Sequence, residues 1–126
     1  LYDGILTIIV AQKKYRDKDY SARQLADDLG TNPRYLSAVI NSRFGMNYSS
    51  LVNEFRIRDA ANMLTDKRYL DMTMEEIGMK AGFANRQSFY AAFYKNMGET
   101  PNSYRKRNLE KSEKKDKDKK KAKKKR

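Results

Sequence analysis

Two predicted helices carry arginine or glutamine close to their first residue. Arg34 follows an Asn-Pro pair, and Arg86 and Gln87 follow Asn85. Arginine can donate two parallel hydrogen bonds to guanine, and glutamine can pair in the same bidentate manner with adenine. In a helix that lies in the major groove, the first residues are the ones that reach the base edges. These positions therefore indicate base recognition in double-stranded DNA.

Other residues on the polar faces of the same helices extend this interpretation. Ser37, Ala38, Tyr90 and Ala91 share those faces, where an alanine or a tyrosine ring can touch a thymine methyl group. For these four, shape complementarity is as good an interpretation as specific readout. The residues suited to phosphate contacts, helped by the free N–H groups of helix N-termini, are Asn32, Tyr35, Asn41, Asn85, Ser88 and Lys95. Each candidate could instead be an ordinary solvated surface side chain.

The composition removes most catalytic chemistry. The chain has no histidine and no cysteine, so the commonest general base at neutral pH and the thiolate and imidazole metal ligands are missing. The carboxylate pairs Asp27-Asp28 and Glu75-Glu76 are adjacent in predicted helices and therefore point apart. The sequence predicts no enzyme activity, no metal site and no cofactor.

Positive charge is concentrated at the C-terminal end. The 126 residues include 28 Lys or Arg and 16 Asp or Glu, for a net charge of +12, and residues 109–126 alone hold 11 basic and 4 acidic side chains. We expect a disordered Lys-rich tail there, which either adds non-specific affinity for nucleic acid or only improves solubility. No apolar run approaches the roughly 20 residues of a membrane span. No membrane contact is expected, and the expected location is the cytoplasm.

The elements that position these side chains are predicted to be helices. Pro33 and Pro101 each follow a capping residue, as is favoured at a helix start, and no stretch alternates apolar and polar residues as a strand would. The predicted fold class is all-α, a seven-helix bundle with two helix-turn-helix subdomains joined by a long linker helix. The predicted helices cover about residues 3–15, 22–29, 33–44, 48–65, 74–81, 86–97 and 101–108.

An internal repeat supports the two subdomains. Each copy has a capped short helix with a predicted capping box, a glycine turn, a second capped helix and a glycine stop. A small residue, Ala26 or Gly78, lets the second helix cross the first, as a helix-turn-helix requires. The units are predicted at about 21–45 and 73–98. The matching positions are Ser21 and Thr73, Gln24 and Glu76, Gly30 and Gly82, Leu36 and Phe89, and Gly45 and Gly98.

The helix between the two units is long enough to matter for DNA geometry. At 18 or so residues it spans about 27 Å, and adjacent major grooves on one face of DNA lie about 34 Å apart. A rigid helix of that length could place two recognition helices about one turn apart. One chain would then read two successive half-sites without dimerising.

Several short motifs match one known family. They are Ile77-Gly78, Ala81-Gly82-Phe83, Ser88-Phe89, Phe93-Tyr94-Lys95, Gly98, Thr100-Pro101 and Tyr104-Arg105, preceded by Phe55-Arg56-Ile57, Ala60 and Leu64. From about Tyr20 to Arg107 the chain resembles the DNA-binding domain of AraC/XylS-type transcription regulators. The resemblance implies a domain over residues 1–108, double-stranded DNA as ligand, and transcription regulation in bacteria as the role.

The resemblance also carries expectations about individual positions and partners. The family's base-reading places fall on Arg34, Ser37, Ala38, Arg86, Gln87, Tyr90 and Ala91. Members often have longer polar side chains where this chain has Ala38 and Ala91, which cannot hydrogen-bond a base edge. Members usually carry a separate sensing or dimerising domain, which agrees with a chain that begins at Leu1. RNA polymerase is a further candidate partner.

Two other binding functions compete with this interpretation. A non-specific nucleic-acid or nucleoid protein is favoured by the Lys-rich tail, but such a protein does not need two fixed reading helices. A helical protein-interaction module would need an exposed apolar groove, and an apolar content of 39% leaves no surplus of residues to line one.

Overall fold

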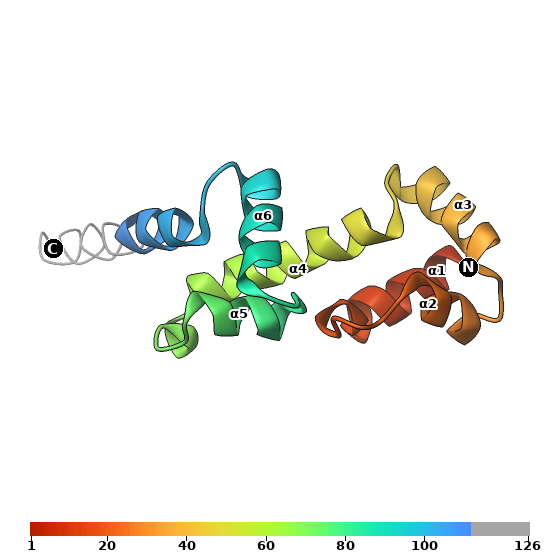
Figure 1. Cartoon of the computed structure of the whole chain (residues 1–126), viewed down its shortest axis with the longest axis horizontal. Helices are drawn as coiled ribbons and strands as arrows, with labels where there is room; N and C mark the ends of the chain where they lie inside the picture. Colours follow the sequence, from red (N-terminus) through yellow and green to blue (C-terminus); the bar gives the residue numbers. More distant parts are fainter. Residues whose placement is uncertain (112–126) are drawn as a thin grey trace, which may run out of the picture.

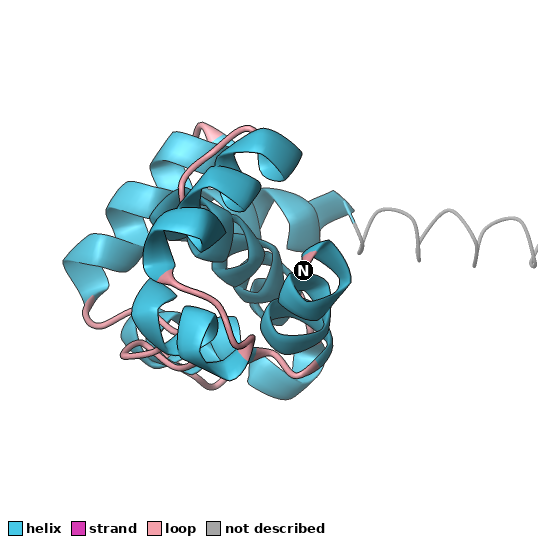
Figure 2. Cartoon of the chain, turned by 90° about the vertical axis from the view of Figure 1, so that its right-hand side faces the viewer, coloured by secondary structure: helices cyan, strands magenta, loops and turns pink. Residues whose placement is uncertain are grey.

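The computed structural model describes residues 1–111, and the regular structure in that range is entirely helical (Figures 1 and 2). The prediction of an all-α fold is confirmed. The main helices are α2 (Ala22–Asp28), α3 (Pro33–Phe44), α4 (Tyr48–Leu64), α5 (Met74–Ala81) and α6 (Arg86–Met97). A C-terminal helix covers residues 101–111, three residues beyond its predicted end. The rest of the predicted tail lies outside the described residues.

The first predicted helix, residues 3–15, is shorter and less regular than expected. It consists of α1 (Tyr2–Ile5) and a π-helical continuation, η1 (Leu6–Ala11). Lys13 then adopts a left-handed conformation with φ of 55°, and a separate 3₁₀ turn, η2 (Lys14–Arg16), follows. The break turns the chain so that Tyr15 is buried, with 7% of its surface exposed. A second 3₁₀ turn, η3 (Lys67–Tyr69), follows α4.

Side-chain caps fix where the longer helices begin. The capping box of Ser21 and Gln24 forms as predicted, and Asn85 forms a further box with Ser88. The box predicted for Thr73 and Glu76 is wrong in one half. The Glu76 N–H donates to Thr73 Oγ1, but the Glu76 carboxylate accepts from the Thr73 hydroxyl instead of the Thr73 N–H. The rotatable hydroxyl offers the carboxylate an alternative donor.

The apolar residues of the described chain form two cores that share α4. Leu51 and Val52, near the start of α4, pack in the first core with Leu36 of α3. Ile57 and Leu64, further along α4, pack in the second core with α5 and α6. Since each core buries apolar surface against the same helix, α4 is a structural part of both helix-turn-helix units.

The crossing of α5 and α6 depends on a glycine. A Cβ atom added to Gly78 would lie 2.7 Å from Cδ2 of Phe89, whose side chain is fully buried. In the first unit Ala26 is also fully buried. The predicted need for a small residue is thus confirmed at the crossing of α5 and α6. The turns that follow contain Gly30 and Gly82, with φ of 68° and 117°, a conformation that favours glycine.

The two second helices of these units are arranged alike. In Figure 1, α3 lies near one end of the molecule and α6 toward the other, and α4 runs between them. In that view both α3 and α6 run upward from their first residues. The two helices therefore run in the same direction in this view, with their first turns toward the same side of the molecule.

Candidate nucleic-acid interface

Burial of one side of α3 determines which residues it exposes. Leu36 and Ile40 are fully buried in the first core. The predicted base-reading residues Arg34, Ser37 and Ala38 are all exposed, as is Asn41. Since residues three and four apart share a helix face, Arg34, Ser37, Ala38 and Asn41 form one continuous polar surface over the first turns of α3.

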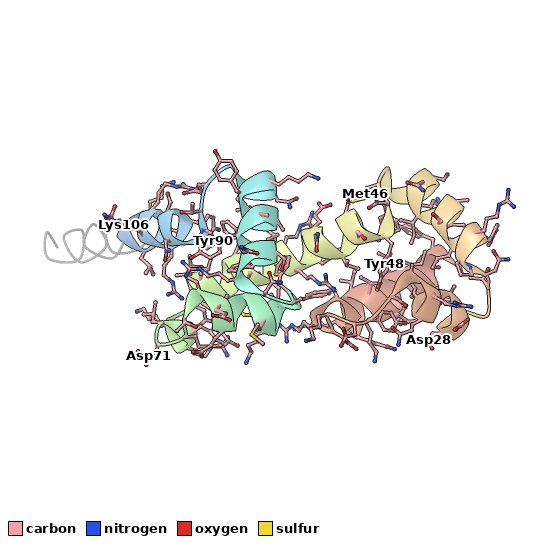
Figure 3. The ribbon with its side chains drawn as sticks, in the orientation of Figure 1. Asp28, Met46, Tyr48, Asp71, Tyr90 and Lys106 are labelled. Carbon is pink, nitrogen blue, oxygen red and sulfur yellow. The ribbon has the colours of Figure 1, made fainter. Side chains whose placement is uncertain are left out.

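In α6, too, the apolar residues are buried and the predicted base-reading residues are exposed, with one exception. Phe89 and Phe93 are fully buried, while Arg86, Gln87 and Ala91 are exposed. Tyr90 is partly buried against the second core. Figure 3 shows Tyr90 between α6 and the C-terminal helix.

The Tyr90 side chain supports a neighbouring arginine. The guanidinium of Arg86 lies 4.8 Å from the centre of the Tyr90 ring, within the range of a cation–π contact. Arg86 Nη2 donates a long hydrogen bond of 3.4 Å to the Tyr90 hydroxyl. Asn102 Nδ2, from the C-terminal helix, donates to the same hydroxyl at 3.1 Å. The structure thus links Arg86 to a second helix through one tyrosine.

Several predicted phosphate-binding side chains are already engaged as caps. Asn32 Oδ1 accepts from the Tyr35 N–H at 2.8 Å, and Asn85 Oδ1 accepts from the Ser88 N–H at 2.8 Å. The amide nitrogens of Asn32 and Asn85 take no part in these caps, so they remain donors for an anion at the helix start. Asn41 Nδ2 donates to the Ser37 carbonyl oxygen at 3.0 Å, which leaves it a single hydrogen to offer.

Tyr35 and Lys95 lie in different places relative to these helix starts. Tyr35 is in the first turn of α3 with 58% of its surface exposed. Lys95 is nine positions after Arg86 in α6, about 13.5 Å along the helix axis. It lines a small groove with Met46 and Ser50. The structure therefore groups Tyr35 with the α3 surface and separates Lys95 from the first turn of α6.

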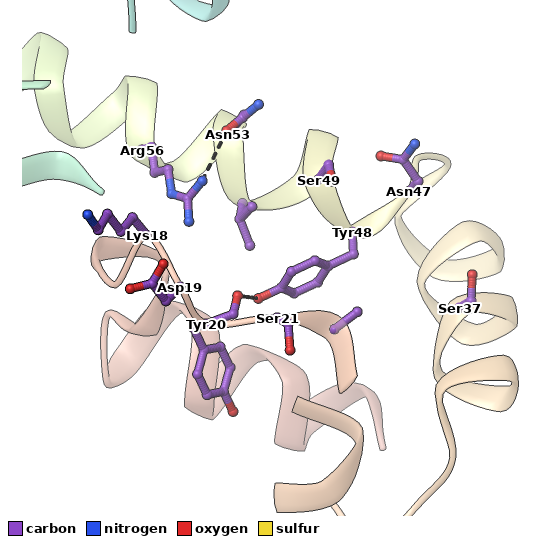
Figure 4. A pocket seen from close by; sticks show the side chains of 12 residues that line it. Lys18, Asp19, Tyr20, Ser21, Ser37, Asn47, Tyr48, Ser49, Asn53 and Arg56 are labelled. Carbon is purple, nitrogen blue, oxygen red and sulfur yellow. Dashed lines mark hydrogen bonds between the residues drawn. The ribbon is translucent and has the colours of Figure 1, made fainter. Parts of the chain in front are cut away.

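An open groove of about 580 Å³ lies between α4 and the chain around α2 and α3 (Figure 4). The Tyr48 hydroxyl, inside the groove, donates to the Tyr20 carbonyl oxygen at 2.7 Å, and burial raises the pKa of Tyr48 to about 12. The lining of the groove is mainly polar and includes Lys18, Ser21, Ser37, Asn47, Ser49 and Arg56.

The arginine of this groove is hydrogen-bonded within the protein. Arg56 donates to the carbonyl oxygens of Tyr15 and Asp17 and to Asn53 Oδ1, at 2.6, 3.2 and 3.3 Å. Burial lowers the pKa of Arg56 from its usual value. Nε, Nη1 and Nη2 each have a protein acceptor, so three of the five N–H groups of this guanidinium are already used within the protein.

No metal-binding cluster or membrane-spanning segment occurs in the described part of the chain. Residues 1–111 contain no group of three or more His, Cys, Asp or Glu side chains that could hold a metal ion. None of the helices there is both long and apolar enough to cross a membrane.

One supporting residue lies outside the predicted site. Asn102 follows Pro101 at the start of the C-terminal helix, twelve positions after Tyr90. Its role depends on how that helix packs against α6. The spacing of polar residues within a single helix gives no signal for such a contact.

Comparison with known proteins identifies the domain. A family model described as "Helix-turn-helix domain" matches residues 25–107. An uncharacterised HTH-type transcriptional regulator of Bacillus subtilis, YtdP, is 30% identical over 89 residues, which are 71% of this chain and 11% of that protein. The chain thus spans about a tenth of the length of the curated relatives it matches.

Solved structures show the same fold. The C-terminal domain of AraT, a response regulator from Geobacillus stearothermophilus, is similar with a TM-score of 0.69 and 30% identity, over 75% of this chain and 76% of that chain. A Chromobacterium violaceum transcriptional regulator, described as an AraC-type DNA-binding domain-containing protein, has a TM-score of 0.68 and 21% identity, over 82% and 91% of the two chains. The chain therefore belongs to the AraC-type helix-turn-helix family, whose domains bind specific DNA sequences in transcription regulation.

Proposed function

We propose that α3 and α6 enter two successive major grooves on one face of the DNA. A single chain then reads two half-sites. The observation that supports this most strongly is the placement of two exposed polar helix faces, both presented in the same sense, along one shared helix (Figure 1). Adjacent major grooves repeat about every 34 Å, and α4, with 17 residues, has a length of about 25 Å.

Within this arrangement the contacts divide into two kinds. Base edges are read by Arg34, Arg86 and Gln87, because these side chains can form bidentate pairs with guanine or adenine. Ser37, Ala38 and Ala91 contribute shape at the same surface. Phosphate contacts come from the N-terminal ends of both helices, where free N–H groups and the cap residues Asn32 and Asn85 lie, and from Asn41 and Lys95 further along the helices. The residues assigned to phosphates are Asn32, Tyr35, Asn41, Asn85, Ser88 and Lys95.

The proposed organisation divides the chain at its C-terminal helix. Residues 1–108 form the DNA-binding domain, with helix-turn-helix units at about 21–45 and 73–98. The Lys-rich residues 109–126 add non-specific attraction to DNA.

The domain is proposed to be the output part of a longer regulator that acts in the cytoplasm. The similarity to the C-terminal domain of a response regulator supports this organisation. So does the small share of the curated relatives that the chain covers. A sensing or dimerising domain is the expected companion, and RNA polymerase is a candidate partner.

Selection from a random duplex library tests the proposal directly. The full chain is incubated with the library at moderate salt, and bound duplexes are sequenced over several rounds. We expect two short enriched motifs centred about 10 base pairs apart, as two reading helices on one face require. An Arg34→Ala, Arg86→Ala double variant is the control, and it should lose the enrichment while keeping weak binding to all sequences.

Other outcomes distinguish the alternatives. Enrichment of one motif only would show that one helix reads bases and the other does not. Binding without any enrichment would favour the non-specific nucleic-acid protein. Absence of binding at low salt would favour the protein-interaction module.

A further inference from the structure

The two cores are joined by a cluster of contacts that includes hydrogen bonds between distant segments of the chain. Its members come from the N-terminal segment, the middle of α4 and the glycine turn after α5. We call it the junction cluster, and it consists of Tyr15, Arg16, Arg56, Asp59, Gly82 and Phe83.

Asp59 of α4 holds the N-terminal segment through three hydrogen bonds. Its two carboxylate oxygens accept from Arg16 Nε at 2.6 Å and Arg16 Nη2 at 3.0 Å, and Oδ2 also accepts from the Tyr15 hydroxyl at 3.0 Å. The Asp59 side chain is only 14% exposed. Bidentate, charge-assisted pairs of this kind fix both distance and angle.

Arg56, one turn earlier in α4, ties the same segment from a second direction. Its Nε donates to the Tyr15 carbonyl oxygen at 2.6 Å. Its guanidinium carbon lies 5.9 Å from the centre of the Phe83 ring, which is buried in the second core. Arg56 therefore contacts the N-terminal segment and the second unit together.

Gly82 brings the turn of the second unit into direct contact with this segment. A Cβ atom added to Gly82 would lie 2.2 Å from the Tyr15 carbonyl oxygen and 3.0 Å from Arg16 Cα. The backbone of the turn after α5 is thus packed on the backbone at Tyr15, whose side chain is part of the first core.

We propose that the junction cluster sets the angle between α3 and α6 and thereby selects the spacing of the two DNA half-sites. This inference rests on the proposed two-groove binding. Arg16 and Asp59 are positioning residues in this role, because both lie outside α3 and α6, the helices that carry the predicted base-reading positions. A change of one base pair in spacing shifts one half-site by about 3.4 Å and rotates it by roughly 35°. A protein with two rigidly held helices cannot follow that change.

The first test measures the helix arrangement without DNA. The chain has no cysteine, so Ser42→Cys in α3 and Tyr94→Cys in α6, both at exposed positions, can carry spin labels. We expect a narrow distribution of label-to-label distances in the doubly labelled chain that is otherwise unchanged. Arg16→Ala and Asp59→Ala should each broaden it.

The matched control is Arg58→Ala. It breaks an exposed ion pair with Glu54 on the same helix, four residues apart, and removes no member of the junction cluster. It should keep the narrow distribution. Thermal unfolding by circular dichroism checks that every variant is folded at the temperature of the measurement. An unchanged distribution in folded Arg16→Ala and Asp59→Ala would overturn the proposal, whatever the DNA results.

The second test uses duplexes in which the two selected motifs are moved closer or further apart by one or two base pairs. The parent chain and Arg58→Ala should lose roughly tenfold in affinity at a shifted spacing, comparable to one or more mismatched base pairs. Asp59→Ala should bind the optimal duplex more weakly and lose less than about threefold on shifting. Its affinity for a single half-site should be unchanged.

The two tests separate this inference from the proposed function. If the library yields no motif pair, two-groove binding fails, and the distance distributions still decide whether the cluster holds the helices. If the motif pair exists but Asp59→Ala keeps the spacing profile of the parent chain, spacing selection by the junction cluster is wrong and two-groove binding stands.

Discussion

The guanidinium of Arg86 stacks on the ring of Tyr90 in the first turns of α6, and among residues 1–111 no comparable contact holds the side chain of Arg34 in α3. The two reading helices therefore present their arginines differently. Arg86 is oriented before it meets DNA, while Arg34 has to lose rotamer freedom on binding. Pre-orientation reduces the entropy lost on association, so the α6 half-site should dominate specificity.

Removal of the oriented arginine should change specificity more than general affinity. Arg86→Ala is expected to weaken the selected site by about 1–3 kcal/mol and to leave random duplex nearly unaffected, because the substitution removes a bidentate pair with a base and leaves the phosphate-binding side chains in place. Titration of both duplexes at one salt concentration measures the ratio. An equal loss on the two duplexes would remove Arg86 from the base-reading set.

Tyr90 should act through Arg86. Tyr90→Phe keeps the ring and loses only the hydroxyl that accepts from Arg86 and Asn102, so its effect on the selected site should be small. Tyr90→Leu loses the ring as well. It should weaken binding to the selected site by about 0.5–1 kcal/mol, the usual range of an exposed cation–π contact.

A double-mutant cycle separates this role from direct base contact. In the Arg86→Ala background, Tyr90→Leu should have no further effect on affinity, because the residue it supports is gone. If Tyr90→Leu lowers the DNA affinity equally in both backgrounds, Tyr90 contacts the DNA directly and independently of Arg86.

The C-terminal Lys-rich segment should contribute to affinity for every sequence. A chain that ends at residue 111 loses ten basic and three acidic side chains. Its affinity should fall for selected and random duplexes alike. The slope of log K against log salt should become shallower by about 0.9 for each phosphate that the shortened chain no longer neutralises. Unchanged affinity at low salt would reduce the segment to a solubilising role.

Substitution of the glycine at the helix crossing should destabilise the second unit. In Gly78→Ala the new Cβ would approach the fully buried Phe89 ring to 2.7 Å. The expected loss is about 1–3 kcal/mol in the free energy of unfolding, even though alanine is favoured over glycine in a helix by about 1 kcal/mol. Urea unfolding measures it. Lys80→Arg, which keeps a cation beside the Tyr69 ring at an exposed position of the same helix, is the control and should stay within about 0.5 kcal/mol.

Alkaline pH should weaken the first core through three tyrosines that pack in it. The pKa of Tyr48 is raised from 10.0 to about 12 by burial, and burial also raises the pKa of Tyr15 and Tyr20. The unfolded chain loses these protons first. The contribution to stability is therefore complete below pH 10 and is lost as the pH rises toward 12.

Urea unfolding between pH 8 and pH 12 measures this dependence. Tyr48→Phe should be less stable at neutral pH by about 1 kcal/mol, because its hydrogen bond to the Tyr20 carbonyl is lost, and its decline above pH 10 should be shallower. Tyr94→Phe, with 61% of the tyrosine exposed, should follow the parent chain. Parallel curves for Tyr48→Phe and the parent chain would contradict the assignment to Tyr48.

Local signals in the sequence were sufficient for much of the fold. Glycine stops, asparagine caps and a proline at the first helical position mark boundaries that depend only on neighbouring residues. The bounds of α3 and α6 were predicted correctly for this reason. The buried positions of α6 followed from its helical period, since Phe89 and Phe93 lie four apart.

Contacts between distant segments had no such signal. Arg16 and Asp59 are 43 positions apart in the sequence. The left-handed conformation that allows Tyr15 to be buried occurs at Lys13, and not at a glycine or asparagine, the residues from which such a conformation is usually predicted. The support of Arg86 by Asn102 likewise depends on how two helices pack. The base-reading and phosphate-binding residues are exposed side chains whose roles stay predictions, because exposure is common to binding residues and to ordinary surface.

The common direction of α3 and α6 gives the domain a polarity (Figure 1). A symmetric dimer relates its reading helices by a two-fold axis and so prefers palindromic sites. Two helices presented in the same sense are related instead by a translation, which calls for a tandem, asymmetric site. Such a site reads differently along its two strands, so it fixes which end of the bound chain points upstream. Inverting the site on a promoter would turn the whole domain around without altering a single contact.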